Sequence, residues 1–408
     1  MAGALFRGVK ILEFGGGAAG PFGTRYFADH GATVVRVESR ERPDFIRILR
    51  MTPDTPGGLD ASLMFAVVNC NKYGIALNLN HPKGREVALR LVEWADVVAE
   101  NFSPKAMAKW GLDYESLRKR KPDLVMISTC LNGQTGPDRF YPGFGGQGSA
   151  IAGFNHLTGW PDREPLGPFG TITDSLSPRY VALLVAAALF HRRRTGEGQY
   201  IDLSQVEGGV VCLTEMILTY AATGEVLGRM GNRSRHAAPH GVFRCAPEGE
   251  DDDRWVAIAV HDDEDWRRFR QAIGDPDWAR EPRFATTEGR LEHVDELERA
   301  VESWTRSQKA EEVAKLLQAA GVDAGIVENF GDLWHDAQLA YRRHFRELEH
   351  PVIGRYFGEA NAIRFSRTPE EFRMAAPCLG QHTELVLREF LGMSEEEYRA
   401  LEAEGVFR

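Results

Sequence analysis

Short apolar runs alternate with longer amphipathic segments over the N-terminal third of the chain. Strands are predicted at Val9–Glu13, Thr33–Val37, Ile75–Leu79, Asp96–Ala99 and Leu124–Ser128. Helices are predicted between them, from Pro21 onward and over Pro82–Ala95, the latter entered through Asn80. Apolar strands that alternate with helices are typical of a parallel sheet covered on both faces, with ligands at the carboxyl ends of the strands. The predicted fold class is therefore α/β with a Rossmann-like large domain.

A long apolar helix is predicted within the segment GTITDSLSPRYVALLVAAALFHRRRTGEGQYIDLSQVE. Ser177 is a favoured capping residue and Pro178 suits a first turn, so we expect the helix to open just after Asp174. The apolar run Val181–Phe190 predicts that this helix is buried. Asp174 is then a carboxylate where scaffold meets cleft, although a simple capping role would also account for it.

The rest of the chain predicts a second, smaller domain. A helical stretch near Gly208–Ala222 leads into the loop GRMGNRSRHAAPHG, which marks a boundary. Strands around the acidic loop EGEDDDR and at Trp255–Val260, with helices at Asp262–Ile273, Leu291–Thr305 and Lys309–Ala320, indicate an α+β domain. The C-terminal segment, with a helix near Thr383–Leu391, has no obvious core of its own. We therefore expect a large domain (1–205), a helical linker (206–230), a small domain (231–325) and a segment (326–408) that returns to the large domain.

Composition excludes several function classes. A formal charge of −10 without a long basic run argues against nucleic acid as a partner. The five scattered cysteines suggest neither a disulfide framework nor a metal site, and fit a reducing cytoplasm. We find no signal-like N-terminal stretch and expect no membrane span.

The segment EFGGGAAGP matches the spacing of a dinucleotide-binding turn. Gly15, Gly17 and Gly20 follow the first strand as GxGxxG, and Glu38 ends the second strand. The spacing indicates that backbone amides at a helix N-terminus can approach a phosphate or a carbonyl oxygen. A nicotinamide-dependent oxidoreductase is one alternative that follows, and a tight turn that serves only packing is another.

Six blocks occur in order over nearly the whole chain: AGPFGTRYFADHGATVVRVE, NCNKYGIALNLNHPKGRE, ADVVAENFSPKAMAKWGLDYESL, TDSLSPRYVALLVAAALFHRRRTGEGQYIDLSQVE, GN near residue 231, and finally RTP, APCLGQHT and LEAEGV. In these blocks the chain resembles the family III CoA-transferases, which include formyl-CoA:oxalate and carnitine CoA-transferases and the related 2-methylacyl-CoA racemases. The resemblance implies that Asp174 attacks an acyl-CoA thioester. It also implies an interlocked homodimer whose large domain combines both ends of the chain.

The chemistry agrees with this role for Asp174. Attack of a carboxylate on a thioester gives a mixed anhydride and CoA thiolate, and an ionised Asp needs no general base. Shuttling between acyl-aspartate and aspartyl-CoA thioester then exchanges the acid, so coenzyme A is a substrate and no prosthetic group is expected. Backbone amides of Gly15–Gly20, with Gly17 and Ala18 foremost, are the candidates to stabilise the oxyanions.

The resembling blocks also provide candidate contacts to CoA, at positions where a parallel sheet binds ligands. Phe102 would stack on adenine, Lys72 and Lys109 would neutralise phosphates, and Arg36 or Arg40 would reach the 3′-phosphate. Taken singly, each lysine could instead be a solvated surface charge. The full candidate set is Gly16, Ala19, Arg36, Arg40, Asn69, Asn71, Lys72, Asn101, Phe102, Lys105, Lys109 and Asn132.

Departures from the family pattern argue against oxalate as the substrate and against racemisation as the reaction. Oxalate-using members carry a glutamine where this chain has Ala18, and a glycine-rich flap where it reads RSRHAAPHG. Racemases place a histidine where it has Phe144, which favours transfer over racemisation.

The flap segment carries a positive cluster of Arg233, Arg235, His236 and His240. This cluster could steer a second carboxylate, as in a succinyl-like donor, or could bind CoA phosphate or line a linker. A racemase, a nicotinamide oxidoreductase and a catalytically silent CoA-binding subunit remain as alternatives.

Overall fold

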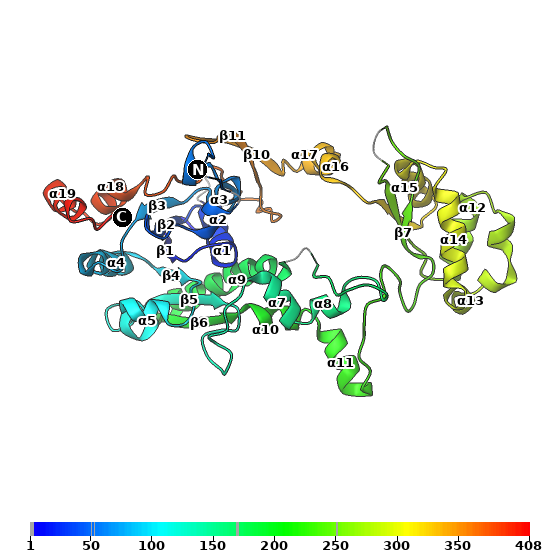
Figure 1. The fold of residues 1–408 in the computed structure, drawn as a ribbon, viewed down its shortest axis with the longest axis horizontal. Helices are drawn as coiled ribbons and strands as arrows, with labels where there is room; N and C mark the ends of the chain where they lie inside the picture. Colours follow the sequence, from blue (N-terminus) through cyan, green and yellow to red (C-terminus); the bar gives the residue numbers. More distant parts are fainter. Residues whose placement is uncertain (1–3, 50, 53, 169–170, 250–251) are drawn as a thin grey trace. The chain divides into compact units, whose positions relative to one another are not determined.

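Two compact units make up the chain, and each contains more than one segment (Figure 1). The computed structural model describes residues 4–49, 51–52, 54–168, 171–249 and 252–408. Unit 1 comprises Met1–His156, Leu166–Leu227 and Ala340–Arg408, and unit 2 comprises Leu157–Pro165 and Gly228–Leu339. These bounds place the predicted helical linker largely within unit 1, and the C-terminal segment joins unit 1 from residue 340 rather than 326.

Unit 1 is built on a six-stranded parallel sheet with the order β3-β2-β1-β4-β5-β6. The strands are β1 (Lys10–Phe14), β2 (Thr33–Glu38), β3 (Tyr73–Ala76), β4 (Val97–Glu100), β5 (Val125–Cys130) and β6 (Gln199–Ser204). The direction of winding reverses between β1 and β4, and open α/β sheets bind ligands at such a switch point. The α/β fold class is confirmed. β6 was not predicted, because half of its residues are exposed at the sheet edge.

Helices cover both faces of this sheet. Ile11 of β1 belongs to a core shared with α1 (Ala19–Asp29) and α9 (Ile172–Thr195). The next residue, Leu12, points to the other core, which includes α4 (Pro82–Trp94). His81, rather than Asn80, is the N-cap residue of α4.

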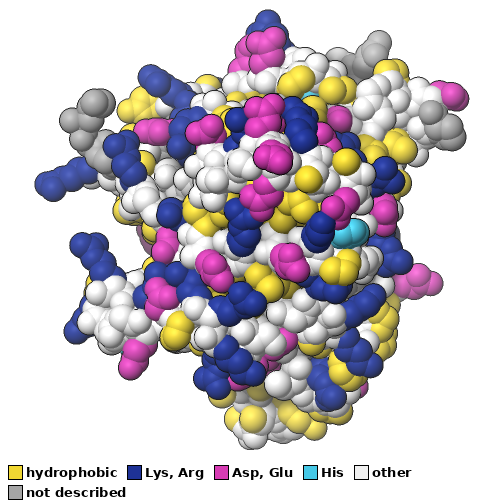
Figure 2. Space-filling model, turned by 90° about the vertical axis from the view of Figure 1, so that its left-hand side faces the viewer, with side chains coloured by type: hydrophobic (Ala, Val, Ile, Leu, Met, Phe, Trp, Pro, Cys, Tyr) yellow, Lys and Arg dark blue, Asp and Glu magenta, His cyan; other side chains and the backbone are white. Residues whose placement is uncertain are grey.

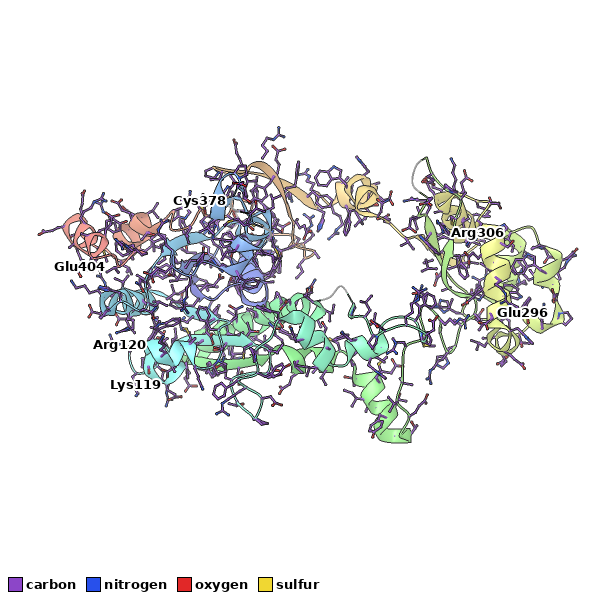
Figure 3. All side chains as sticks on the ribbon, in the orientation of Figure 1. Lys119, Arg120, Glu296, Arg306, Cys378 and Glu404 are labelled. Atoms are coloured by element: carbon purple, nitrogen blue, oxygen red, sulfur yellow. The ribbon has the colours of Figure 1, made fainter. Side chains whose placement is uncertain are left out.

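The C-terminal segment completes the core on the α4 face. It contains α18 (Thr383–Leu385), a π-helical turn over Val386–Phe390 and α19 (Glu395–Ala403), and buries Val386, Leu401 and Phe407 there. Surface ion pairs join α4 to the region of α19, such as Lys83–Glu404. Glu404 is labelled in Figure 3. Basic and acidic side chains are interspersed over the face drawn in Figure 2.

The long helix α9 differs from its prediction in two respects. It begins at Ile172, so Asp174 lies within its first turn, Ser177 does not cap it and Pro178 is an interior residue. Only one side is buried, because α1 and the sheet cover a single face: Val181 is 1% exposed, whereas Phe190 is 63% exposed. By length and composition alone α9 could cross a membrane, contrary to expectation, but here it connects two strands of the sheet.

Shorter elements complete unit 1. They are α2 (Phe45–Ile48), α3 (Leu63–Asn69), α5 (Ala106–Trp110), α6 (Tyr114–Leu117), α7 (Gly145–Ile151), α10 (Gln205–Val211), α11 (Thr214–Thr223) and the antiparallel pair β10 (Phe345–His350) and β11 (Gly354–Glu359). Along the chain, α8 (Phe154–Leu157) and α17 (Ala337–Tyr341) each include residues of both units. A 3₁₀ turn spans Gly58–Ala61.

Unit 2 is an antiparallel sheet covered by helices. Its strands are β7 (His240–Arg244), β8 (Trp255–Ala259) and β9 (Asp323–Ile326), and its helices are α12 (Asp263–Ala272), α13 (Thr287–Glu292), α14 (Val294–Thr305), α15 (Ala310–Ala319) and α16 (Phe330–His335). The predicted strand pair is β7 and β8, and Glu250 and Asp251 of the acidic loop lie outside the described residues. β9 was not predicted. Trp266 and Phe269 are buried at the centre of this core.

We expect Gly23→Ala to destabilise the protein, because α1 and α9 are in close contact at this glycine. A β-carbon at Gly23 would lie 2.5 Å from Cγ1 of Val181 and 3.2 Å from the carbonyl oxygen of Pro178. Overpacking of this kind costs about 1–3 kcal/mol. Chemical denaturation measures the loss. Gly228→Ala is the control, since its β-carbon would meet no atom within 4 Å, and equal stability of the two variants would contradict the prediction.

Candidate active site

Three helices of unit 1 begin around the carboxylate of Asp174. Asp174 lies in the first turn of α9, and its carboxylate accepts hydrogen bonds from the Gly145 backbone N–H and the Gln205 side chain. Gly145 is the first residue of α7, and Gln205 is the first residue of α10. Helix N-termini carry partial positive charge and favour anions. The surroundings of Asp174 therefore suit a carboxylate and the negative charge that develops when it reacts.

The approach of Gly145 to Asp174 is too close for any side chain. A β-carbon at Gly145 would lie 2.4 Å from Oδ2 of Asp174. The carbonyl of Gly145 in turn accepts hydrogen bonds from the hydroxyls of Ser149 and Thr173. The start of α7 is thus held against the first turn of α9.

Partial burial alters the acidity of Asp174. Burial raises its pKa above the ordinary value, and the donors from Gly145 and Gln205 act in the opposite direction. The carboxylate oxygens are thus partly stripped of water but keep two donors, an arrangement that suits a nucleophile that uses no general base.

The N-terminus of α1 lies at the same edge of the sheet as Asp174. Both α1 and α9 cross over between parallel strands, so they run in the same direction. They contact one another where Gly23 meets Pro178 and Val181. Gly23 lies four residues after Ala19 in α1, and Pro178 lies four residues after Asp174 in α9. The first turns of the two helices are therefore adjacent.

The glycine turn before α1 is built differently from the prediction. Gly15 and Gly17 have φ of 118° and 74°, which glycine alone adopts easily. The amide of Gly16 donates to Oδ1 of Asn101 at 3.0 Å, and that of Gly17 donates to Oδ1 of Asp44 at 2.9 Å. These two amides are therefore occupied and do not serve an oxyanion. Ala18 is the N-cap of α1, and the amides of Ala18 and Ala19 precede the first intrahelical bonds.

An aromatic pair stands between the glycine turn and Asp174. Phe144, immediately before Gly145, is 61% exposed, and its ring lies 5.1 Å from that of Phe45. A β-carbon at Gly17 would lie 2.8 Å from the Phe45 ring. An acyl group bound at Asp174 would therefore meet apolar surface on this side.

Four of the predicted CoA ligands have structural roles instead: Arg36, Lys72, Asn69 and Asn71. Arg36 is fully buried with Glu13 and Asp44, and Lys72 is fully buried with Nζ 2.8 Å from Oε2 of Glu13. Contact with a phosphate would require each cation to leave its buried partners, so the assigned phosphate roles do not fit.

The two asparagines beside Lys72 are buried as well. Asn69 accepts a hydrogen bond from Lys72. Asn71 adopts φ of 64°, donates to Asp29, and accepts from the backbone of Arg373 and Met374. Both asparagines thus join segments of unit 1 rather than face a ligand.

The remaining candidates in unit 1 are nearer the surface. Arg40 and Lys109 are exposed, and Asn132 donates to the carbonyl of Asp138 within its own loop. Phe102 is partly buried against the core and meets Trp110 edge to face, at 5.7 Å between ring centroids. Asn101 holds the glycine turn through two hydrogen bonds. Besides accepting from the Gly16 amide, it donates from Nδ2 to the Gly16 carbonyl at 2.7 Å.

Lys105, one of the predicted CoA contacts, belongs to a cationic and aromatic cluster whose other two members, Arg139 and Phe140 after β5, sequence reasoning missed. The exposed ring of Phe140 lies 4.2 Å from Nζ of Lys105 and 4.3 Å from the guanidinium carbon of Arg139. Such a cluster can bind a phosphate beside a planar ring. The dipeptide RF in GPDRFYPG was the only sequence signal for Arg139 and Phe140.

In unit 2 ion pairs neutralise Arg233 of the predicted positive cluster. Arg233 forms ion pairs with Asp295 and Glu298 at 2.5 and 2.6 Å. Nδ1 of His240 contacts the Asn232 carbonyl at 2.6 Å, and His236 and Arg235 are exposed. Arg233 and His240 line a cavity of about 870 Å³ over the sheet, whereas Arg235 and His236 are not among its lining residues.

Comparison with known proteins identifies the family of this chain. A family model described as CoA-transferase family III matches residues 6–383. The chain belongs to CoA-transferase family III. The succinyl-CoA–D-citramalate CoA-transferase of Chloroflexus aurantiacus is 34% identical over 98% of this chain and 97% of its own. The succinate–glutarate CoA-transferase of Agrobacterium fabrum is 30% identical over 94% of both chains. A CAIB/BAIF family protein from Brucella suis has a TM-score of 0.85 at 29% identity, covering 95% of this chain and 100% of its own.

These matches confirm the family and the enzyme class that the sequence predicted. The chain is a CoA-transferase, and the family acts on CoA thioesters as substrates. The nicotinamide oxidoreductase alternative, which rested on the GxGxxG spacing, is set aside in favour of CoA transfer. The roles of individual residues stay predictions.

This family III enzyme also buries a carboxyl group on the sheet face opposite α9. Glu100 ends β4, and its carboxylate accepts from the Phe102 backbone N–H at 2.8 Å and from Ser128. Burial raises the pKa of Glu100 to about 7, Asp202 acts in the same direction, and the two donors act against it. Gln134 lies 3.4 Å from this carboxylate. The pKa of neighbouring Cys130 is raised to about 12 by burial and by the Glu100 and Asp202 charges.

We expect Glu100→Gln to remove a pH dependence of stability. The folded state holds the Glu100 proton more tightly than the unfolded state does. The stabilisation that this protonation gives is therefore fully present below about pH 4.5 and is lost as the pH rises through about 7. The variant should therefore gain stability relative to wild type between about pH 5 and about pH 8, measured by denaturant titration. Glu207→Gln, at an exposed glutamate, controls for loss of a charge. A constant difference across this range would contradict the prediction.

Proposed function

We propose that this enzyme moves CoA from an acyl-CoA donor to a carboxylic acid through covalent intermediates on Asp174. The observation that carries the proposal is the setting of Asp174, a carboxylate held by the Gly145 amide and the Gln205 side chain where three helices begin. The family match over residues 6–383 supports the same reaction class.

The reaction balances with Asp174 as the only protein nucleophile. Its carboxylate attacks the thioester carbonyl, the C–S bond breaks, and a mixed anhydride and CoA thiolate form. The thiolate attacks the aspartyl carbonyl of the anhydride, which releases the first acid and leaves an aspartyl-CoA thioester. The acceptor carboxylate attacks this thioester to give a second anhydride, and the thiolate then attacks its acyl carbonyl. The products are the new acyl-CoA and free Asp174.

Each tetrahedral intermediate needs donors aimed at its oxyanion. The amides of Ala18 and Ala19, at the start of α1, take this role, since those of Gly16 and Gly17 are occupied. Phe45 and Phe144 contact the acyl chain, and Lys105 and Arg139 pair with CoA phosphates beside the Phe140 ring. These assignments replace Lys72 and Arg36 as the cations that meet CoA.

The proposed donors are short dicarboxylic acyl-CoA thioesters such as succinyl-CoA. The names of the relatives from Chloroflexus aurantiacus and Agrobacterium fabrum support this class, since both name succinate or its CoA thioester. The cluster around Arg233 supports it less than the sequence suggested, because two carboxylates already pair with that arginine. Racemisation is not proposed, because the side chain of Phe144 cannot transfer a proton.

A homodimer is the proposed working form. Helix α11 exposes Ile217, Leu218 and Tyr220, and none of its residues is buried within the chain. The exposed apolar face of α9 adds Leu183 and Phe190. Apolar patches of this extent mark interaction surfaces, and the second chain of an interlocked pair is the proposed occupant.

We expect Asp174→Asn and Asp174→Ala to lose activity by about three orders of magnitude or more while they retain CoA binding. The reason is that the proposed role is covalent. In wild type, acyl-CoA without acceptor followed by hydroxylamine should add the hydroxamate mass to the Asp174 peptide, as measured by mass spectrometry. The Asp174→Ala variant is the control. Near wild-type turnover of Asp174→Asn, or modification of a different residue, would contradict the mechanism.

We expect light scattering to give about twice the 45.5 kDa mass of one chain at all concentrations at which the protein stays folded. Interlocked chains cannot separate without unfolding, so dilution should not release a monomer. Leu218→Ser tests whether α11 lies in the interface. A folded monomer of the wild-type protein at low concentration would contradict the proposed form.

A further inference from the structure

The glycine turn that precedes α1 is held by side chains from three other segments of unit 1. Nη2 of Arg36, on β2, donates to the Gly15 carbonyl at 3.1 Å. Asn101, directly after β4, brackets Gly16 through both its amide and its carbonyl. The turn is therefore fixed from both neighbours of β1 in the sheet, at the point where the winding reverses.

Asp44 supplies the third restraint, nearest to α1. Its carboxylate is buried and accepts from the Gly17 amide at 2.9 Å through Oδ1 and at 3.2 Å through Oδ2. It also accepts from the Ile46 amide as the N-cap of α2, and pairs with Arg36. Burial raises the pKa of Asp44, while Arg36 and the two amides act to lower it. One buried carboxylate thus joins the glycine turn, α2 and β2.

The restraint on Gly17 bears directly on the amides at the start of α1. Gly17 is the last residue before the N-cap Ala18, and its φ of 74° sets the direction in which α1 begins. The Phe45 ring, one residue after Asp44, lies over Gly17. A shift of Asp44 would therefore move both the turn and the adjoining aromatic surface.

We propose that Asp44 is a positioning residue for acyl transfer, which holds Gly17 so that the first amides of α1 face the oxyanion formed when Asp174 attacks the thioester. This inference rests on the proposed function, in which Asp174 is the nucleophile. The polar contacts of Asp44 within the described residues are to the glycine turn, α2 and β2, so its proposed role is indirect. Its contribution is to geometry that matters most in the transition state, so it should affect kcat more than KM.

The first test compares Asp44→Asn and Asp44→Ala with Asp60→Asn. Asp60 is a matched control, because it pairs with Arg47 in the same charged region and contacts the C-terminal segment instead of the glycine turn. The rate of Asp174 acylation by acyl-CoA is measured in single turnovers, with hydroxamate formed at the Asp174 peptide as the readout. KM for acyl-CoA is measured in steady state.

We expect Asp44→Ala to slow acylation by about tenfold to a hundredfold with little change in KM, as for a misplaced oxyanion donor. Asp44→Asn should fall between Asp44→Ala and wild type, because its Oδ1 can still accept from Gly17. Asp60→Asn should acylate at the wild-type rate whatever its effect on stability. If Asp44→Ala does not fold, Asp44→Asn decides the matter, and acylation at the wild-type rate overturns the proposal.

A spectroscopic readout separates positioning from general stability. In an Asp174→Asn background the bound thioester does not react, and its carbonyl stretch reports hydrogen bonds to the oxygen. Adding Asp44→Asn should move this band toward its frequency in the absence of donors, and adding Asp60→Asn should leave it in place. An unchanged band in the Asp44 variant would overturn the inference. Failure of wild type to acylate Asp174 would instead overturn the proposed function, so the two failures are distinct.

Discussion

The buried guanidinium of Arg36 is the interaction on which the rest of unit 1 depends. It lies at the carboxyl end of β2, fully buried, with Glu13 of β1 on one side and Asp44 on the other. Glu13 extends the chain of charges to Lys72, which also donates to the Pro21 carbonyl at 2.7 Å. Strands β1 and β2, the loop before β3 and the first turn of α1 are joined in this way.

Physical chemistry explains why such a network must be complete. Burial alone would raise the pKa of Glu13, but Lys72 and Arg36 lower it to about 2. Burial lowers the pKa of Lys72 to about 8, against the opposing charge of Glu13. Removal of one partner from a buried pair costs about 3–5 kcal/mol, because the other charge is left without compensation. The network therefore specifies one arrangement of the segments that it joins, and the glycine turn before α1 is among them.

The candidate nucleophile Asp174 depends on a different kind of constraint. Asp174 is reached by a backbone amide from α7 and a side chain from α10, both brought in by helix packing. Gly145 permits this because any side chain would collide with the carboxylate, and Gly23 permits α1 and α9 to lie close enough for their first turns to share an edge. A charged network on one side of the turn and close glycine contacts on the other thus fix the position of the proposed site.

The sequence by itself determined the parallel α/β architecture, the family and Asp174 as the candidate nucleophile. These are properties of local pattern: apolar runs predict strands, and Asp174 opens a long helix within a recognisable block. Arg36 and Lys72 were predicted to meet CoA phosphates, because along the chain they resemble accessible cations. Only the tertiary structure decided that they are buried, since burial of a charge requires a partner, and Glu13 and Lys72 are 59 residues apart. It likewise decided which amides of the glycine turn are occupied, because their acceptors, Asp44 and Asn101, come from other segments that only folding brings to the end of β1.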